Sequence, residues 1–266
     1  MAKLLLIGCG KMGGALLKRA AGEIATVTHV VDPLAPTDDL KSLPGVKWYA
    51  TLDNLDAAFI PDLAVIALKP QVMTKTLPAY GRYSSTPFLS VAAGQTMARL
   101  ATLLGNDNHA IVRAMPNLAA SVNASMTVAV ANKNVTQTQR DLCDGLLSCV
   151  GQVAWLKDEA LMDAVTALSG SGPAYVFALA EAMAEAGKKL GLTHELSEQL
   201  ARQTIIGSGA LLAQSSESMA ALRMAVTSPG GTTEAALKYL LADTGLGNLI
   251  EMAMTAARRR AKELAE

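Results

Sequence analysis

A glycine-rich segment near the amino terminus constrains the fold more than any other part of this 266-residue chain. Lys3 to Ile7 is an almost continuous apolar run, typical of a strand buried on both faces, and Gly8-Cys9-Gly10-Lys11-Met12-Gly13 follows it at once. A helical pattern covers Ala15 to Ala21, and a second apolar run, Val27 to Val31, ends in Asp32. This order of strand, G-x-G-x-x-G loop, helix, strand and acidic residue, with the loop and the acidic residue separated by about 20 positions, predicts a dinucleotide-binding unit.

Each glycine of the loop has an expected purpose. Gly8 permits the tight turn, Gly10 lets the backbone approach a pyrophosphate, and Gly13 lets helix and strand pack closely. The Asp32 carboxylate is suited to the hydroxyls of an adenosine ribose and repels a 2′-phosphate, and Pro33-Leu34-Ala35-Pro36 supplies no Arg or Lys to neutralise one. The sequence therefore favours NADH over NADPH, the alternative being that Asp32 only starts a turn before Pro33.

Strands and helices go on alternating up to residue 157. Further strands are expected at Val46–Tyr49, Leu63–Leu68, Phe88–Val91, Ala110–Arg113, Met126–Ala131 and Gln152–Leu156. Helices are expected at Gln71–Leu77, at Met97–Leu104 and, behind a capping box formed by Thr136 and Gln139, up to about Leu147. The pattern predicts an α/β fold in which residues 1–157 form a Rossmann-type, doubly wound, mostly parallel sheet.

Ligands of such sheets bind beyond the carboxyl ends of the strands. The strand tips expected at that edge are Gly8–Gly13, Lys69-Pro70, Ala92–Gly94 and Met115–Asn117. Lys69 and Arg113 also stand at strand ends, where two interpretations are open: each faces a ligand, or each is a solvated charge.

Residues 158–266 show only helical patterns and predict an all-α, C-terminal dimerisation and substrate domain. Its helices are expected at Leu161–Leu168, Ala174–Leu190, from a Thr193 cap to about Ala213, Met219–Val226 and Leu246–Leu264. The run Thr204–Ala213 is apolar on every side, as in a helix buried all round. About 110 helical residues are too few to enclose it, so we expect a homodimer formed by this half.

The segment Thr227-Ser228-Pro229-Gly230-Gly231-Thr232-Thr233 breaks these helices. Pro229 and the two glycines favour a tight turn, and a helix is expected to begin at about Thr232. Unpaired backbone amides and the helix dipole make such a turn a seat for one small anion, although a plain capped turn has the same composition.

Composition narrows the class of partner. Charged residues are 17% of the chain and the formal net charge is zero, which argues against nucleic acid or an acidic membrane face as the main partner. The basic run Arg258 to Arg260 is interpreted as a solvated helix end. No apolar segment reaches the length of a membrane span. Cys9, Cys143 and Cys149 lack metal-ligand spacing, so we expect no metal and a cytoplasmic protein with reduced thiols.

Taken together, these motifs make the whole chain resemble the pyrroline-5-carboxylate reductases. The matching segments are Ile7–Gly13, Leu68–Pro70, Val91–Gly94, Arg113–Asn117, Ser169-Gly-Ser-Gly-Pro-Ala-Tyr175 and Thr227–Thr233. The first is shared with many dehydrogenases, whereas the last three are specific in their order and spacing. The resemblance implies an oxidoreductase acting on a CH–NH group, which reduces 1-pyrroline-5-carboxylate to L-proline with NAD(P)H in the last step of proline biosynthesis. It also implies C-terminal helices interleaved in a homodimer, often assembled further into a homodecamer.

The resemblance also assigns residues. The cofactor-binding positions are Gly8, Cys9, Gly10, Lys11, Met12, Gly13, Asn54, Ala67, Leu68, Lys69, Pro70, Val91, Ala92 and Ala93, to which the strand-end argument adds Asp32. The substrate-binding positions are Met115, Pro116, Asn117, Ser228, Gly231, Thr232 and Thr233, with Met115 to Asn117 approaching the nicotinamide. Thr233 matches the residue that reaches the ring nitrogen and is the catalytic candidate. Its hydroxyl is a poor acid, so water is an alternative proton source.

Two positions depart from the family pattern. Members commonly favour NADPH and often carry a small or basic residue where this chain has Asp32, and some carry a Glu where this chain has Ser216.

Two other functions stay open from the sequence. A different Rossmann-type imine or hydroxyacid reductase needs a general acid or base, often a helix Lys, but Lys188 and Lys189 stand at a helix end. A non-catalytic, dinucleotide-sensing protein has no need of the carboxylate turn. The three histidines, His29, His109 and His194, are not favoured as catalysts.

Overall fold

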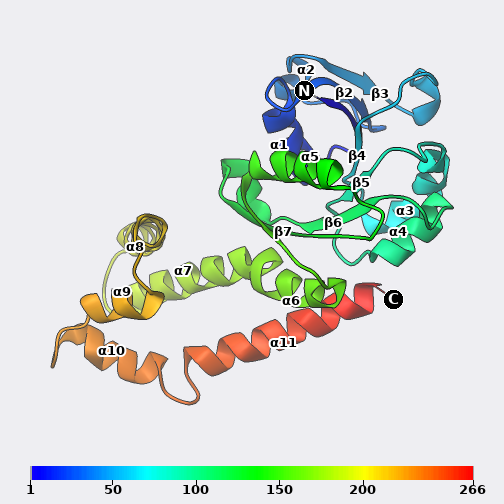
Figure 1. Cartoon of the computed structure of the whole chain (residues 1–266). Coiled ribbons are helices and arrows are strands. Elements are labelled where there is room, and N and C mark those ends of the chain that lie inside the picture. Colours follow the sequence, from blue (N-terminus) through cyan, green and yellow to red (C-terminus); the bar gives the residue numbers. More distant parts are fainter. Residues whose placement is uncertain (1, 266) are drawn as a thin grey trace. The chain divides into compact units, whose positions relative to one another are not determined.

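The structure is a computed structural model that describes residues 2–265 (Figure 1). By contacts between residues the chain divides into two compact units. The sheet unit runs from the amino terminus through Gly170 and takes up the segment from Ala257 onward, and the helical unit is Ser171–Ala256. Each unit is described by itself below.

The sheet unit is built on eight strands in the order β3-β2-β1-β4-β5-β6-β7-β8. They are β1 (Ala2–Ile7), β2 (Ala25–Val31), β3 (Val46–Tyr49), β4 (Leu63–Ile66), β5 (Phe88–Ser90), β6 (Ile111–Met115), β7 (Ser125–Ala131) and β8 (Gly151–Trp155). Neighbouring strands are parallel except for the antiparallel pair β6 and β7. The order of strands reverses between β1 and β4, and a crevice at such a reversal is where open α/β sheets bind ligands.

Helices cover both faces of the sheet (Figure 1). One core packs α1 (Lys11–Ala20), α2 (Asp38–Lys41) and α5 (Gln137–Ser148) against the sheet, and the other packs α3 (Pro70–Thr76), the 3₁₀ helix η2 (Leu77–Arg82) and α4 (Met97–Leu104). Successive residues of β1 point to opposite cores, Leu4 and Leu6 to the first and Leu5 and Ile7 to the second. Burial on both faces therefore explains the continuous apolar run of this strand.

Local signals in the sequence predicted these elements well. Thr136 and Gln139 form the expected capping box, in which the Thr136 hydroxyl accepts from the Gln139 amide and the Gln139 side chain accepts from the Thr136 amide. Helix α1 begins at Lys11 rather than Ala15, because the last residues of the glycine loop already form its first turn. Strand β4 ends at Ile66 rather than Leu68, because the chain turns away after the Ala67 amide bonds to the Ile7 carbonyl.

The single helix expected at Leu161–Leu168 is wrong in detail. The chain instead forms η4 (Glu159–Leu161), α6 (Met162–Val165) and a π-helical turn, η5 (Thr166–Gly170). The Thr166 hydroxyl donates to the Met162 carbonyl at 3.0 Å beside this change of pitch. These residues group with the sheet by contact, whereas the expected division at residue 157 follows secondary structure and stays a prediction.

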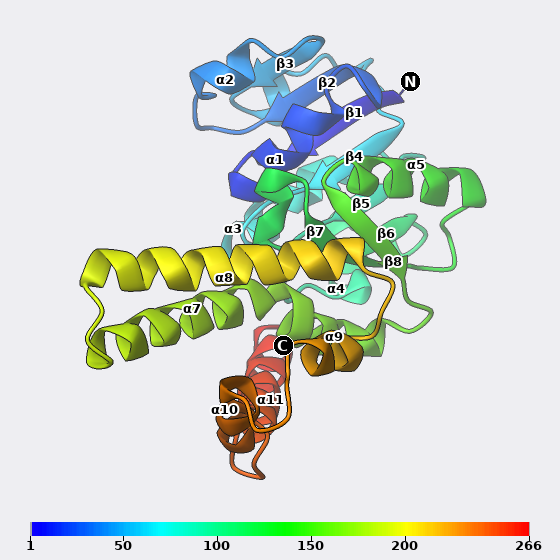
Figure 2. The same cartoon turned by 90° about the vertical axis from the view of Figure 1, so that its left-hand side faces the viewer.

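The helical unit contains α7 (Gly172–Lys189), α8 (His194–Gln214), α9 (Met219–Ala225), α10 (Thr232–Leu240) and the first part of α11 (Leu246–Ala265). Helices α7 and α8 lie side by side and run in opposite directions (Figure 2). A Cβ at Gly187 would lie 3.0 Å from the Ser197 hydroxyl, so glycine allows this close approach.

Little of the helical unit is buried in the single chain. The middle of α8 is not enclosed within one chain, since Ile206, Leu211 and Leu212 are 55, 61 and 50% exposed, which agrees with the expectation that a single subunit is too small to bury it. Apolar faces of this extent are typical of protein interfaces. Among residues 2–265, no helix combines the length and the hydropathy needed to cross a bilayer.

Candidate functional site

The glycine loop after β1 forms a cradle that side chains would fill. Gly8 has a φ of +84°, and a Cβ there would lie 2.8 Å from the Leu68 side chain. A Cβ at Gly13 would lie 2.7 Å from the Gly8 carbonyl oxygen, so helix and strand approach each other as expected. Gly10, by contrast, faces open space. The loop is thus tight at its base and open at Gly10, where a ligand can approach the backbone.

The amino terminus of α1 supplies donors at this open position. The first helical hydrogen bond runs from the Gly14 amide to the Gly10 carbonyl at 2.8 Å. The amides of Lys11, Met12 and Gly13 come before this bond and have no acceptor within the helix. No side chain caps the helix at Gly10 either. Together with the helix dipole, these amides form a seat for a pyrophosphate.

Asp32 takes part in building the loop. One of its carboxylate oxygens accepts from the Cys9 amide at 2.6 Å, and the other accepts from the Leu34 amide at 2.8 Å. The turn interpretation of Asp32 is therefore correct as far as Leu34 is concerned, but it is incomplete, since the same side chain also fixes the glycine loop. Each oxygen keeps a second lone pair for a ribose hydroxyl.

The other predicted cofactor residues lie on three further segments, which follow β3, β4 and β5. Ala67 to Pro70 follows β4, with Lys69 exposed and Pro70 beginning α3. Val91 to Ala93 follows β5, and the Val91 amide is tied to the Ile66 carbonyl at 3.0 Å. Asn54 ends the 3₁₀ helix η1 (Leu52–Asn54) after β3, where its side-chain oxygen accepts from the Thr51 hydroxyl at 2.8 Å. All three segments follow parallel strands of the sheet and thus lie at the same edge as the glycine loop.

A cavity of about 540 Å³ beside the glycine loop is lined by cations, of which Lys18 and Arg19 were not predicted from the sequence. Lys11, Lys18 and Arg19 line it from α1, opposite Thr37. Lys18 forms an ion pair with Asp39 at 2.5 Å. The expected absence of a nearby cation rested on the residues after Asp32, whereas Lys18 and Arg19 reach this cavity from the last turn of α1.

Asn117, at the tip of β6, is held by the protein on every side. Its amide group donates to the Ser169 carbonyl at 3.2 Å, its side-chain oxygen accepts from the Ala119 amide, and its backbone amide donates to the Ser125 hydroxyl. These hydrogen bonds fix the conformation of the chain after β6. They thereby hold the preceding residues, Met115 and Pro116, in place.

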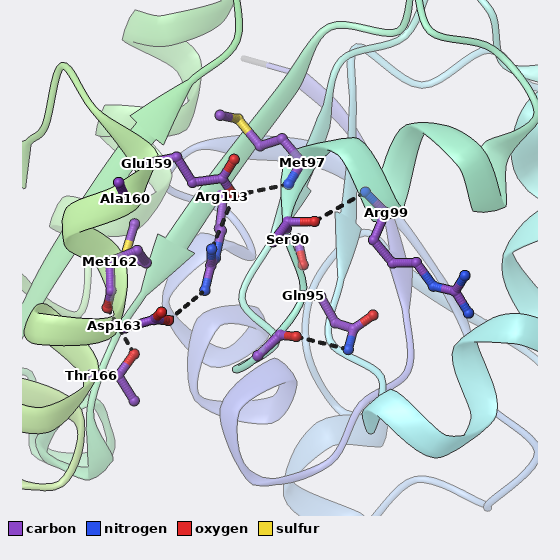
Figure 3. A network of polar contacts seen from close by, with 12 residues as sticks. Ser90, Gln95, Met97, Arg99, Arg113, Glu159, Ala160, Met162, Asp163 and Thr166 are labelled. Carbon is purple, nitrogen blue, oxygen red and sulfur yellow. Dashed lines mark hydrogen bonds and ion pairs between the residues drawn. The ribbon is translucent and has the colours of Figure 1, made fainter. Parts of the chain in front are cut away.

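Arg113 is not a solvated strand-end charge, so that interpretation was wrong. Its side chain is only 4% exposed and forms an ion pair with Glu159 at 2.9 Å (Figure 3). Asp163 lies 3.9 Å from the other guanidinium nitrogen. The partners are 46 and 50 positions away in sequence, and no local signal pairs them with Arg113.

In the helical unit, the predicted anion seat is the turn before α10. Gly230 has a φ of +70° and follows Pro229, and the Gly231 amide donates to the Ser228 carbonyl at 3.0 Å, as in a type II turn. Gly231 also leaves room for the Ser228 hydroxyl, which a Cβ would overlap. Helix α10 begins at Thr232, as predicted.

Glu234 already occupies part of this turn. Its carboxylate accepts from the Gly230 amide at 2.7 Å, and the first helical bond runs from Ala235 to the Gly231 carbonyl. The amides of Thr232, Thr233 and Glu234 come before this bond and have no acceptor within the helix, so they can form a seat for an anion. Sequence reasoning missed Glu234, although an acidic residue in the first turn of a helix is a recognisable capping signal.

Two cationic side chains adjoin the turn. Arg223 and Lys238 line a cavity of about 380 Å³ together with Thr227 and Glu234. The motif itself contains no Lys or Arg, but the fold supplies both from α9 and α10. Thr233 is half-buried, at the second position of α10.

Neither the loop cysteine nor the two buried histidines offer an alternative catalyst. Burial, followed by the nearby Asp32, raises the pKa of the Cys9 thiol to about 12, so the loop cysteine is not a nucleophile at neutral pH. His29 and His109 lie in the cores, and burial lowers the pKa of each. Among residues 2–265, no three His, Cys, Asp or Glu side chains are grouped so as to hold a metal ion.

Comparisons with known proteins agree with one another. Residues 159–264 match the family model described as pyrroline-5-carboxylate reductase dimerisation. The chain is 39% identical to the pyrroline-5-carboxylate reductase of Pseudomonas aeruginosa, covering 99% of this chain and 97% of the relative.

Solved structures show the same likeness over the whole chain. The pyrroline-5-carboxylate reductase of Coxiella burnetii superposes with a TM-score of 0.89 at 36% identity, covering 100% of this chain and 99% of that one. The enzyme of Plasmodium falciparum, solved with NADP bound, gives a TM-score of 0.83 at 29% identity, covering 100% and 98% of the two chains.

Proposed function

The chain belongs to the pyrroline-5-carboxylate reductase family, and we propose that it reduces 1-pyrroline-5-carboxylate to L-proline, the last step of proline biosynthesis, by hydride transfer from a reduced nicotinamide dinucleotide. The observation that carries the proposal is that this chain, which covers 97% of the Pseudomonas aeruginosa relative, contains both a seat for a dinucleotide and a seat for a small anion. These seats are a glycine cradle open at Gly10 and a turn that aims the first amides of α10 at one anion.

The sheet unit fits a dinucleotide, because Gly8 and Gly13 leave no room for a Cβ while Gly10 is open. The amides of Lys11 to Gly13 would hold the pyrophosphate, and the strand tips 67–70 and 91–93 would line the rest. The bound nicotinamide supplies the hydride. Asp32 favours NADH by accepting from the ribose hydroxyls, whereas the cations of α1 offer charge that a 2′-phosphate could use.

In the helical unit, the Thr232 and Thr233 amides and the dipole of α10 would hold the carboxylate of the substrate. Thr233 would hydrogen-bond the ring nitrogen, orient the imine and pass on a proton that water provides. The protein therefore has to position the nicotinamide ring against the pyrroline ring and to deliver one proton. Catalysis requires the two rings to come into contact, within a subunit or between subunits.

The protein acts as a homo-oligomer. The family model matched by residues 159–264 describes dimerisation, and the exposed apolar residues of α8 are suited to a second copy of this chain. A decamer assembled from dimers and a cytoplasmic location belong to the same proposal. Light scattering coupled to size-exclusion chromatography measures the oligomer directly.

An assay of the purified protein with pyrroline-5-carboxylate and each reduced nicotinamide tests the function. Oxidation of the cofactor at 340 nm with matching formation of proline is expected, and NADH is the better donor. Faster reduction of 2-oxoacids or of other imines, offered as substrates in the same assay, would favour a related reductase. Cofactor binding without any turnover would favour a dinucleotide sensor, and either result would overturn the proposal.

A further inference from the structure

The segment that links the sheet to the first long helix is tied to the sheet by a buried cation. The Arg113 guanidinium lies between Glu159 and Asp163, and the Glu159 oxygen that pairs with it also accepts from the Met97 amide at 2.8 Å (Figure 3). A buried charge without a partner costs several kcal/mol, so the pairing holds η4 and α6 against β6 and the start of α4.

The π-helical turn Thr166–Gly170 is next along this anchored segment, and it contacts both β7 and the tip of β6. The Ser169 hydroxyl donates to the Met126 carbonyl at 3.1 Å, while the Ser169 carbonyl accepts from the Asn117 side chain at 3.2 Å. One residue later, a Cβ built on Gly170 would overlap the terminal Cε methyl of Met115. The absence of a side chain at Gly170 therefore makes the space in which Met115 lies.

Glycine is not needed at position 170 for backbone conformation. Gly170 does not have a positive φ, and the other nearby atoms belong to the Met115 chain and to the Thr166 methyl at 3.7 Å. An alanine there would meet the flexible end of one side chain rather than the backbone, so it would displace Met115 and leave the fold in place.

We infer that the turn Thr166–Gly170 positions the Met115–Asn117 tip for the reaction, and that Gly170 is a positioning residue that sets where the Met115 side chain lies. This inference rests on the proposed function and on the expectation, from the family resemblance, that Met115 approaches the nicotinamide. The inference gives a role to Ser169 and Gly170. Both belong to the family-specific segment Ser169–Tyr175, and neither is among the residues assigned to the cofactor or to the substrate. Single π-helical turns are frequent at functional sites, and this one aligns a neighbouring tip.

A double-mutant cycle tests the inference. Gly170→Ala, Met115→Ala and the combined variant are compared with the parent, and Gly172→Ala is the matched control, because a Cβ at Gly172 meets nothing within 4 Å. For each protein we would measure kcat, the KM for the imine, the Kd for NADH from fluorescence, and the melting temperature. Methionine methyl NMR reports on Met115 independently of activity, since Met115→Ala identifies its resonance among the 12 methionines.

We expect Gly170→Ala to shift the Met115 methyl resonance and to lower kcat by about tenfold to 100-fold, since misplacement by about 1 Å can cost that much. The Kd for NADH and the melting temperature should stay close to the parent values. In the Met115→Ala background, Gly170→Ala should change kcat by less than about twofold, because the group it displaces is gone.

Other outcomes would overturn the inference. These are an equal loss of kcat with and without Met115, an unmoved Met115 resonance, or an equal loss in Gly172→Ala. If Gly170→Ala alone does not fold, the combined variant must fold, because the overlap has been removed; failure of both contradicts the inference. Should the parent not turn over the imine, the proposed function fails, while the NMR result still decides whether Gly170 positions Met115.

Discussion

At the scale of single residues, Asp32 shows how one side chain can serve the fold and the ligand together. It fixes the Cys9 and Leu34 amides, so replacing it with alanine would disturb the glycine loop as well as cofactor choice. Asn is the sharper change, because it removes the negative charge and keeps one acceptor oxygen.

We predict that Asp32→Asn raises kcat/KM with NADPH relative to NADH by about tenfold, because a charge near a 2′-phosphate is removed. The loss of one charged hydrogen bond should cost about 1.5–3 kcal/mol of stability. Steady-state kinetics with both cofactors measures the ratio, and Asp38→Asn, an exposed carboxylate on α2, is the control. An unchanged ratio would mean that Asp32 only builds the loop.

The cysteines give a second prediction at this scale. Burial raises the pKa of Cys9 and of Cys143 to about 12, and it raises the pKa of Cys149 as well. At pH 8 the thiolate fraction of Cys9 is then on the order of 10⁻⁴, so iodoacetamide should leave the native protein unmodified and active. Mass spectrometry should show three alkylated cysteines after denaturation in urea. Rapid alkylation of Cys9 in the native protein would contradict this.

At the scale of elements, the parts that sequence predicted are those whose causes are local. The capping box of α5, the glycine loop and the start of α10 each depend on residues a few positions apart. Arg113 was misjudged because its burial and its partner Glu159 arise only when β6 meets a distant segment. Lys18 and Arg19 of α1 and the π-helical turn were missed for the same reason, since tertiary packing decides where they lie.

Helix α10 illustrates a conflict within one element. Glu234 satisfies the Gly230 amide, but it places a carboxylate at the same helix end that we propose for the substrate carboxylate. Glu234→Gln keeps an acceptor and removes the repulsion, so the KM for the imine should fall about threefold to tenfold, with a stability cost of about 0.3–1 kcal/mol.

Kinetics and thermal unfolding measure these two effects. Glu195→Gln is the matched control, because Glu195 occupies the first turn of another helix, α8, and should leave the KM unchanged. A rise in KM on changing Glu234 would show that its carboxylate holds the substrate instead of competing with it.

At the scale of the whole molecule, the two units differ in how they are stabilised. The sheet unit encloses a core on each face, whereas in the helical unit large apolar side chains of α8 stay exposed in the single chain. Oligomerisation therefore contributes to the stability of the helical unit, and stability must be compared at fixed protein concentration. Both tryptophans, Trp48 and Trp155, lie in the sheet unit, so their fluorescence follows the unfolding of that unit.

The sheet unit should lose stability at mildly acidic pH. His109 has no exposed surface and contacts the Phe88 ring edge-on, and burial lowers its pKa below the usual 6.5, with a smaller opposing effect from the Leu104 carbonyl. Burial lowers the pKa of His29 in the same way. The unfolded chain therefore binds protons that the folded chain does not, in the range from about pH 6.5 down to the folded pKa values, and the free energy of unfolding falls as pH falls through that range.

We predict that the urea midpoint from tryptophan fluorescence drops between pH 7.5 and pH 5.5, and that the midpoint of His109→Leu drops less. At pH 7.5, where the histidine is neutral in the folded and the unfolded chain, the substitution should cost little, because it replaces a buried polar ring with an apolar group. The gap between the two curves should open only below about pH 6.5, which separates titration of His109 from a general loss of packing. Parallel curves over the whole range would assign the acid sensitivity to other groups, with His29→Leu as the next variant to compare.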